Sequence, residues 1–243
     1  MSRWLKALPL ALAVATLSLM TTGCNTTSQA KIRLVHAIQD ANALDIAING
    51  TKEFTNIAFM QLQPPSGYKA VPGGVDTFQG YLTGTPTQIF STSNVKLFAG
   101  TEYTVVATGF ITNSSSVLII AATDTNTVPP NGIIDFRIIN ASPSAPSPLD
   151  IYIQQAQVQG LTPPATISAL PYQGVSKYIS VPYNTTGAGY TVYVCPAGST
   201  NPLFRQTIPV GGTSLGSIRT LILTDQQNVN QLNPQFMILN DVN

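Results

Sequence analysis

The chain repeats itself once, and this repeat constrains its fold more than any other feature of the sequence. The segment Ile32–Ala37 matches Phe136–Ala141, and each segment carries an arginine at its second position. The two arginines, Arg33 and Arg137, are 104 residues apart, and a second match aligns Asp45 with Asp150, 105 residues apart. Such a period is the length of a domain, whereas solenoid repeats span about 20–50 residues. The repeat therefore predicts two tandem domains.

The repeat also sets the domain boundaries. Copy one is expected over residues 31–123, a linker rich in polar residues, Pro and Gly over 124–132, and copy two over 133–243. Weaker matches extend the alignment along the chain: Tyr68–Pro72 with Tyr178–Pro182, Gly100–Val105 with Gly187–Val192, and Thr123-Asp124 with Thr224-Asp225. The tail Phe236–Asn240 resembles Phe136–Asn140, which suggests that the chain ends on a lone opening strand.

Within each copy the hydrophobic pattern has a period of two. In Leu44–Asn49 apolar residues occupy alternate positions, which is typical of a strand with one buried face. Turn signals such as Pro72-Gly73-Gly74 recur, and about seven strands per 100 residues favour an antiparallel β-sandwich. The run Leu97–Val105 resembles the tyrosine corner of immunoglobulin-like and fibronectin type III domains, with Tyr103 as its tyrosine; Tyr190 is the proposed counterpart in copy two. The expected fold is two tandem antiparallel immunoglobulin-like sandwiches.

The opening strands of both copies resemble a known family. Arg33, His36 and Asp45 in copy one, and Arg137 and Asp150 in copy two, fit the motif R-x-x-H-A-S-P-D-A-P-x-x-D-x-Y. This motif is similar to that of a bacterial envelope family known as domain of unknown function 4397. Copy two keeps both prolines of the motif but has Asn140 in place of the histidine. The resemblance implies immunoglobulin-like sandwiches on an exported protein and brings no established activity.

The first 23 residues are typical of a secretory signal. Arg3 and Lys6 precede an apolar run from Leu8 to Met20, which is too short to span a bilayer. The segment ends Met20-Thr21-Thr22-Gly23-Cys24, which resembles a bacterial lipobox and implies cleavage before Cys24 and lipidation of its sulfur. Residues 24–30 would then form a short tether, and Asn25 favours sorting to a Gram-negative outer membrane. The alternative is an ordinary signal cut elsewhere.

Composition makes nucleic acid a poor candidate partner. Charged residues make up only 9% of the chain. Subtracting Arg3 and Lys6 from 11 basic side chains leaves nine, against ten acidic ones, so there is no basic surface for nucleic acid. If Cys24 carries lipid, Cys195 has no disulfide partner, and its apolar surroundings predict a buried, inert thiol.

Searches for catalytic or metal-binding patterns give weak signals. Gly212–Gly216 fits G-x-S-x-G around Ser214, but the single histidine, His36, lies upstream and a strand follows the serine, which does not fit a hydrolase elbow. Asp40, Asn42 and Asp45 lie close together as in a calcium loop, but counted from Asp40 the EF-hand Gly and Glu positions hold Asp45 and Thr51, which leaves only a looser oxygen site as an alternative. We therefore expect no catalytic residue, metal or cofactor. His36 is predicted to bond the loop Ile38–Ala43, with Asn140 making a comparable bond, and Asp45 and Asp150 are predicted to anchor turns.

The leading functional hypothesis is a non-catalytic lipoprotein of the cell envelope, acting as a structural module or binding an envelope protein. Alternation along the strands places Tyr152 and Tyr193 on the solvent side of copy two, which makes them the candidate interaction surface. The short tether places copy one near the membrane and copy two at the distal end. The same tyrosines would serve a glycan-binding module, which is the alternative function, and a hydrolase is the remote one.

Overall fold

The computed structural model describes residues 28–183, 187–210, 216–227 and 232–241, and these contain strands and turns but no helix. The all-β sandwich fold expected from the period-two pattern is confirmed. Copy one consists of β1 (Gln29–Ile38), β2 (Leu44–Ile48), β3 (Thr51–Ile57), β4 (Leu62–Gln63), β5 (Lys69–Pro72), β6 (Gly74–Leu82), β7 (Gln88–Leu97), β8 (Glu102–Phe110) and β9 (Asn113–Thr123). Copy two consists of β10 (Ile133–Asn140), β11 (Leu149–Gln155), β12 (Ile167–Leu170), β13 (Ile179–Pro182), β14 (Tyr190–Pro196), β15 (Phe204–Ile208), β16 (Ser217–Asp225) and β17 (Pro234–Asn240).

The two copies share one topology. In copy one, the sheet β3-β2-β6-β7 faces the sheet β4-β1-β8-β9, with β5 also pairing with β1. In copy two, β12-β11-β14-β15 faces β13-β10-β16-β17. Most pairs are antiparallel, but β1 with β8 and β10 with β16 run parallel, which the sequence did not indicate. Each sandwich closes over its own apolar core, centred on Phe78 in copy one and on Phe136 in copy two.

Strand register defines which residues of the two copies are equivalent. Arg33 pairs with Thr104, and Arg137 pairs with Thr220, so β8 corresponds to β16. Likewise Ile32 pairs with Lys69 and Phe136 with Ile179, so the expected match of Tyr68–Pro72 with Tyr178–Pro182 is correct.

Three other expected equivalences are wrong. Asp124 was expected to match Asp225, but Asp225 ends β16 and corresponds to Gly109 of β8. The counterpart of Asp124, which directly follows β9, is Asp241, which directly follows β17. Tyr190 lies on β14, which pairs with β11 as β6 pairs with β2, so it is not the counterpart of Tyr103 on β8. The tail strand β17 pairs with β16 and closes copy two instead of standing alone. Similar short apolar strings on different strands caused these errors.

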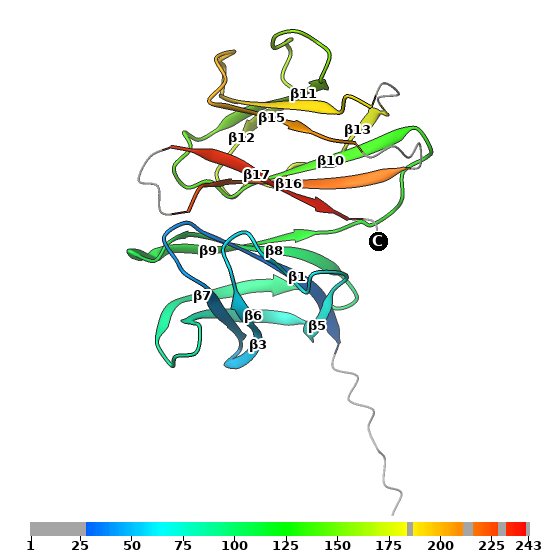
Figure 1. Cartoon of the computed structure of the whole chain (residues 1–243). Coiled ribbons are helices and arrows are strands. Elements are labelled where there is room, and N and C mark those ends of the chain that lie inside the picture. The colour runs from blue at the N-terminus through cyan, green and yellow to red at the C-terminus, as the bar shows by residue number, and fades with distance from the viewer. Residues whose placement is uncertain (1–27, 184–186, 211–215, 228–231, 242–243) are drawn as a thin grey trace, which may run out of the picture.

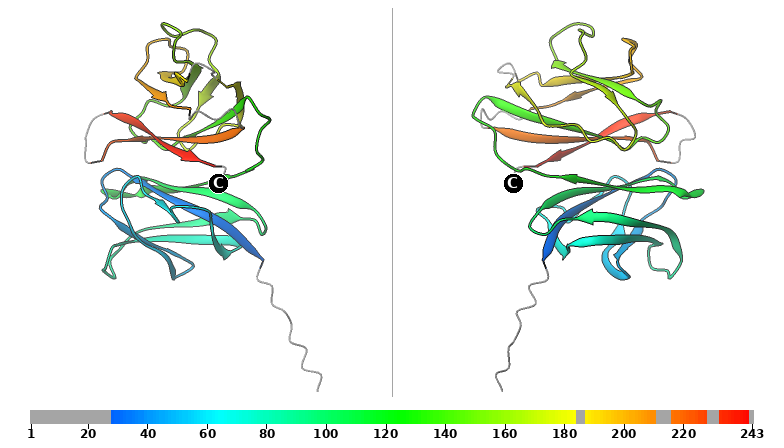
Figure 2. Two further views of the ribbon diagram at one scale, coloured as in Figure 1. Left: turned by 45° about the vertical axis from the view of Figure 1, so that its right-hand side comes forward. Right: turned by 180° about the vertical axis from the view of Figure 1, so that it is seen from behind.

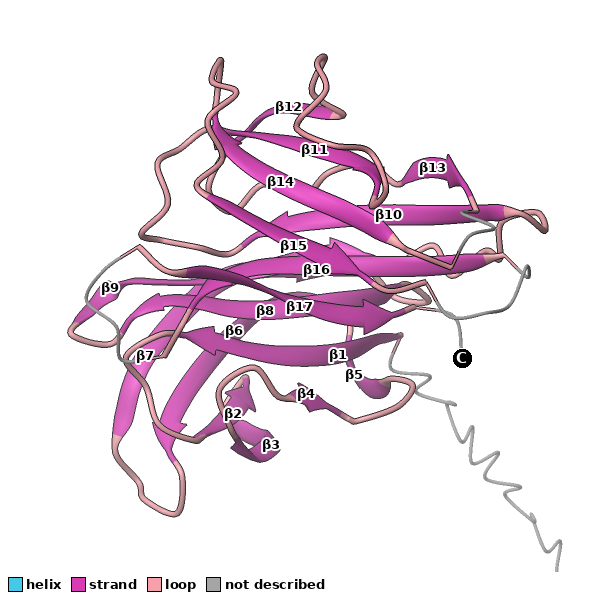
Figure 3. Ribbon diagram, turned by 45° about the horizontal axis from the view of Figure 1, so that its top comes forward, coloured by secondary structure: helices cyan, strands magenta, loops and turns pink. Residues whose placement is uncertain are grey.

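The two sandwiches pack face to face, so that the four sheets form a layered stack (Figures 1 and 2). The inner layers are the sheet containing β1, β8 and β9 and the sheet containing β10, β16 and β17; Figure 3 shows these strands from another direction. The last two residues of the expected tether, Gln29 and Ala30, belong to β1 and pair with Pro72 and Val71 of β5.

Strands β1 and β10 point the same way. Near their starts, Arg33 contacts Asp241 and Arg137 contacts Asp124. Near their ends, the Thr108 hydroxyl donates to the Ala141 carbonyl at 2.7 Å. Both copies therefore begin at the same end of the pair, and copy two lies beside copy one.

Candidate functional site

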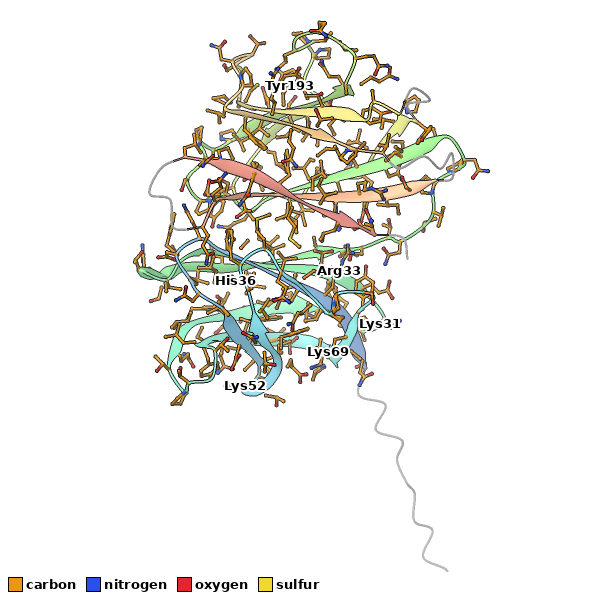
Figure 4. The ribbon with its side chains drawn as sticks, viewed as in Figure 1. Lys31, Arg33, His36, Lys52, Lys69 and Tyr193 are labelled. Atoms are coloured by element: carbon orange, nitrogen blue, oxygen red, sulfur yellow. The ribbon has the colours of Figure 1, made fainter. Side chains whose placement is uncertain are left out.

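The most unusual site in the described chain lies between the two copies and contains four buried charges. Arg33 on β1 and Arg137 on β10 point out of their own sandwiches into the space between the inner sheets, and Figure 4 shows Arg33 close to this boundary. Asp124 and Asp241 directly follow β9 and β17, the strands next to β8 and β16. All four residues are buried. We call these residues the interdomain clasp.

The ion pairs of the clasp cross between the copies. Arg33 Nη2 lies 2.5 Å from Asp241 Oδ1, and Arg137 Nη2 lies 2.6 Å from Asp124 Oδ1. Each arginine also reaches the second aspartate, with Arg33 Nε 3.3 Å from Asp124 Oδ2 and Arg137 Nη2 3.6 Å from Asp241 Oδ2. The two ion pairs are related by approximate two-fold symmetry, because each copy gives an arginine to the other copy and receives one from it. An isologous dimer interface has the same symmetry, but here both halves belong to one chain.

Equivalent hydroxyl groups complete each half of the clasp. The Thr104 hydroxyl accepts from Arg33 Nε at 2.8 Å and donates to Asp124, and the Thr220 hydroxyl accepts from Arg137 Nε at 3.0 Å and donates to Asp241. A buried charge is tolerated when such hydrogen bonds satisfy its remaining donors and acceptors.

Two tyrosines cover the clasp, one from each copy. The Tyr68 hydroxyl donates to Asp124 at 2.7 Å, and the Tyr178 hydroxyl donates to Asp241 at 3.3 Å. Their rings lie against the arginines, with centroids 5.4 Å from Arg33 Cζ and 4.8 Å from Arg137 Cζ, within the range of a cation–π contact. Burial raises the pKa of Tyr178 to about 12 and raises the pKa of Tyr68 still further. Both hydroxyls therefore stay protonated and donate at neutral pH.

The charge state of Arg33 reflects its surroundings. Burial acts to lower the pKa of Arg33, but the carboxylates of Asp241 and Asp124 act in the opposite direction and hold it above its ordinary value. The guanidinium therefore remains charged, and the clasp as a whole contains two positive and two negative groups.

Apolar residues surround the clasp and bury the rest of the boundary. They come from both copies at equivalent positions, such as Val35 with Ile139 and Val106 with Ile222. At the far end of the boundary, Gln227 Nε2 donates to the Ala41 carbonyl at 2.8 Å. The boundary is thus a shared apolar core with the clasp at one end and the Gln227–Ala41 hydrogen bond at the other. These contacts hold the two sandwiches in one arrangement.

His36 is locked in its neutral form. Its Nδ1 accepts from the Ile38 amide at 3.2 Å, so Nε2 carries the proton and donates to the Asn42 carbonyl at 3.0 Å, which is the expected bond to the following loop. Burial lowers the pKa of His36 to about 4. Asn140 makes a comparable pair, since its Oδ1 accepts from the Ser142 amide at 3.3 Å and its Nδ2 donates to the Pro171 carbonyl at 3.1 Å. With both ring nitrogens engaged, His36 is poorly suited to act as a general base.

Asp45 and Asp150 each anchor a turn, as their recurrence suggested, and tie it to a bulge in the neighbouring edge strand. Asp45 accepts from the amides of Asn56 at 2.9 Å and Gly84 at 3.5 Å, and also binds Lys52 at 3.0 Å. The hydrogen bonds of Asn56 and Lys52 hold the pKa of Asp45 below its usual range although burial opposes this. Asp150 accepts from the amides of Ala169 and Gly198, both at 2.8 Å.

The anchored bulge and turn have the same backbone shape in both copies. Asn56 and Ala169 have φ values of 53° and 54°, and Gly84 and Gly198 have φ values of 73° and 77°. A left-handed residue is costly for a non-glycine side chain, so the carboxylate bond to its amide offsets local strain. Asp45 and Asp150 thus have an identical task inside the fold.

The tyrosine corner is present in copy one. The Phe98 amide donates to the Tyr103 hydroxyl at 2.9 Å, which fixes the turn before β8. Tyr190 is also buried, and its hydroxyl donates to the Pro182 carbonyl, but it does so from β14 and therefore does not form a second corner of this type.

The expectation that Tyr152 and Tyr193 are exposed is wrong. Each has only 5% of its surface exposed. They pack with Cys195 against Leu161 and Ala165, in the segment between β11 and β12, which folds over the outer face of this sheet. Alternation correctly placed the rings away from the main core, but it carried no information about a loop that covers them. Burial also raises the pKa of the Cys195 thiol, which agrees with the inert cysteine expected.

The described residues contain no group of three or more His, Cys, Asp or Glu side chains that could hold a metal ion. Asp40 instead accepts from the amides of Ile111 at 2.7 Å and Thr112 at 2.9 Å, and so fixes the turn between β8 and β9. Cys24 and Ser214 lie outside the described residues.

None of the sequence predictions included the clasp, although the repeat contains a signal for it. Arg33 and Arg137 interrupt otherwise apolar strands at equivalent positions of the repeat. A charge that recurs inside a buried strand requires an acceptor, and a face that bears it in both copies can meet its counterpart.

The folds and the clasp define the class: a tandem immunoglobulin-like β-sandwich protein whose copies are joined face to face. The chain belongs to the family described as Domain of unknown function (DUF4397), whose family model matches residues 30–152. The matched region covers copy one and extends through β10 into β11, so it includes Arg33, Asp124 and Arg137. A search of curated proteins found no match.

Proposed function

We propose that this protein is a non-catalytic module of the bacterial cell envelope, anchored through lipid on Cys24, in which two sandwiches act as one rigid body. The interdomain clasp carries this proposal. Two sandwiches that swung freely on a linker would not need four buried charges with crossed pairing. A fixed pair suits a spacer, or a platform that holds a binding surface at a set distance and angle.

The use of the ionisable side chains supports a non-catalytic role. Arg33, Arg137, Asp124 and Asp241 satisfy one another, while His36, Asp45 and Asp150 bond backbone groups of the fold. Catalytic groups are normally placed with unused donor or acceptor capacity facing a cleft, and none of these seven has that arrangement. The remote hydrolase alternative gains nothing from His36, because both of its ring nitrogens are bonded within the fold.

The anchoring part of the proposal rests on the sequence Met20–Cys24 and on the apolar run before it. Within the described residues, no helix is long and apolar enough to cross a membrane. The first described strand begins at Gln29, so the proposed lipid site is five residues from the start of the folded domain. This short connection favours a protein held against the membrane surface, and Asn25 favours the outer membrane.

The partner proposed for this platform is another envelope protein. A glycan remains the second candidate, but it relied on Tyr152 and Tyr193 as a stacking platform, and their burial withdraws that support. The interaction surface must therefore be sought elsewhere on the rigid pair.

The anchor is tested by mass spectrometry of the protein recovered from membranes. We expect a chain that begins at Cys24 and carries acyl groups, and we expect Cys24→Ala to lose the acyl mass and leave the membrane fraction. Cys195→Ala is the matched control, since this buried cysteine is remote from the cleavage site and its loss should leave lipidation unchanged. A membrane-extracted wild-type chain with a different first residue and no acyl mass would reject the anchor.

The interaction is tested by crosslinking the intact protein in cells and identifying what is captured. Capture of one envelope protein at reproducible positions, lost when the clasp is broken by Arg137→Met, would support a rigid platform. Capture that is unaffected by Arg137→Met would show that the fixed arrangement is unimportant for binding.

A further inference from the structure

Two large apolar side chains project from the end of copy one at which the chain enters the fold. Phe98 is 68% exposed and Val75 is 62% exposed, the two highest values among the large apolar side chains of the described residues. Single exposed apolar residues are common on soluble proteins, but neighbouring ones mark contact sites more often. These two are neighbours, because Gly74 pairs with Leu97, the residue directly before Phe98.

Val75 lies at the start of β6 and Phe98 directly follows β7, and the backbone beside each of them is fixed to the start of β1. The Gly73 amide donates to the Ser28 carbonyl at 2.9 Å, and the Gly100 amide donates to the Gln29 carbonyl at 2.8 Å. A side chain at residue 73 would lie 2.7 Å from that same Ser28 carbonyl, so only glycine allows the two backbones to pass so closely. These two backbone segments therefore enclose the point at which the chain leaves toward Cys24.

The exposed phenylalanine is held firmly. The Phe98 amide donates to the Tyr103 hydroxyl, and the Phe98 carbonyl accepts from the Thr101 amide at 3.2 Å. The tyrosine corner thus fixes a turn whose first residue projects an aromatic ring into solvent. Lys96, directly opposite Val75 in the strand pair, is exposed beside this apolar pair.

We propose that Val75 and Phe98, with Lys96 beside them, form a membrane-contacting tip that enters the headgroup region of the bilayer to which the protein is anchored. This inference rests on the proposed lipid at Cys24. Four peptide steps join Cys24 to Ser28, which span at most about 14 Å when fully extended. A tip that encloses the exit point of so short a connection lies at the bilayer surface whenever the lipid is inserted.

The chemistry of the tip suits that location. Phenylalanine is among the apolar residues that interfacial membrane anchors bury at the boundary between headgroups and acyl chains, and a lysine beside it can reach the phosphate level while its aliphatic stem stays among apolar groups. The acyl groups proposed on Cys24 provide attachment, and contact through the tip would fix the orientation of the attached protein.

This orientation revises the expectation that copy two is the distal end. Both copies begin at the same end of the pair, and the tip lies at that end. Contact through Val75 and Phe98 would bring this end of copy one to the membrane, with copy two beside copy one.

The test uses tryptophan fluorescence of the lipidated protein in vesicles containing phospholipids with brominated acyl chains. Trp4 is the only tryptophan in the sequence and precedes the proposed cleavage site, so Phe98→Trp gives the mature chain a single reporter at the tip. Val175→Trp is the matched control: Val175 is 38% exposed and bridges Ile139, next to the last residue of β10, at the opposite end. We expect a blue shift and bromine quenching for the Phe98→Trp variant, and neither for the Val175→Trp variant.

The outcomes separate the tip from the anchor. If the intact mass of the Phe98→Trp protein shows acyl groups and the protein floats with vesicles, but its fluorescence is quenched no more than that of the Val175→Trp protein, the tip proposal is overturned while the anchor stands. If acyl mass is absent and the protein does not float, the anchor fails. In that case quenching of the Phe98→Trp protein on vesicles with added anionic lipid would still support the tip, and its absence would reject it.

Discussion

Arg33 of copy one and Asp241 of copy two, 208 positions apart in the sequence, form a buried ion pair with 2.5 Å between Nη2 and Oδ1. Its mirror image, Arg137 with Asp124, crosses in the opposite direction. Neither sandwich therefore satisfies its own arginine alone. Removing one arginine leaves two buried carboxylates with a single guanidinium between them, and the resulting loss of stability can be measured.

We expect Arg137→Met to lower the free energy of unfolding by about 3–5 kcal/mol, the usual cost of removing one partner from a buried ion pair. Methionine keeps much of the side-chain volume, so the loss reports on charge more than on packing. Urea unfolding followed by circular dichroism measures it. Arg205→Met provides the control: Arg205 is exposed, and its replacement should change stability by less than about 0.5 kcal/mol. Equal losses in the two variants would contradict a special role for the clasp.

Stability should fall in mild acid because of His36. Its folded-state pKa is about 4, below the value of about 6.5 for an unfolded chain, so the unfolded state takes up a proton first as the pH falls. The neutral histidine contributes fully above about pH 6.5, and the contribution is lost progressively as the pH falls toward 4. Each tenfold difference in proton affinity between the folded and unfolded states is worth about 1.4 kcal/mol, so the free energy of unfolding should fall by roughly 3 kcal/mol over this pH range.

His36→Asn isolates this effect, because copy two already has Asn140 at the equivalent position. We expect the variant to lose less stability than the wild type between about pH 7.5 and about pH 4.5, as measured by urea unfolding at each pH. Carboxylates titrate in both proteins and cancel in the comparison. Identical pH profiles would show that His36 is not buried in its neutral form.

Truncation of Tyr193 should destabilise copy two, whereas truncation of a solvent-exposed ring would leave stability nearly unchanged. The ring is buried beneath the segment between β11 and β12, so Tyr193→Ala should cost about 3 kcal/mol, as for other buried aromatic side chains. Tyr193→Phe keeps the ring and should stay within about 0.5 kcal/mol of the wild type. Thermal unfolding compares the three proteins. A stable Tyr193→Ala variant would restore the exposed-surface hypothesis.

Loss of the Asp150 carboxylate should loosen the bulge in β12 and the turn after β14 at once. Asp150→Ala leaves the amides of Ala169 and Gly198 without their acceptor, at a cost of about 2 kcal/mol. Hydrogen exchange should show faster exchange at these two amides in particular. Asp135→Ala, which removes only an exposed bond to Ser180, is the control and should leave both amides protected.

The features that could be predicted from the sequence are those that depend on residues close together in the chain. Alternation in Leu44–Asn49 and the repeated opening strands were enough for the sandwich fold, and the loop bond of His36 involves residues only six positions apart. Asp45 and Asp150 could be assigned to turns because their recurrence in two copies marks a task of the fold. Each of these inferences concerns contacts within one supersecondary unit.

What the sequence did not indicate depends on chain segments that meet only after folding. Burial of Tyr152 and Tyr193 requires Leu161 and Ala165 to fold back over the sheet, which strand alternation does not encode. Similar strings around Tyr103 and Tyr190 belong to different strands, so local similarity misaligned them. The clasp requires the relative placement of two domains, which hydrophobic pattern within either domain cannot supply.

The crossed pairing has a consequence for how the protein is made. Chains emerge from synthesis with the N-terminus first, and N-terminal domains generally fold first. Copy one therefore completes its strands while Arg33 still lacks the carboxylate of Asp241 and while Val35 and Val106 still face water. The inner sheet of copy one is covered only after copy two has been synthesised and has folded against it. Until then, the side of the interface that copy one contributes stays exposed to water.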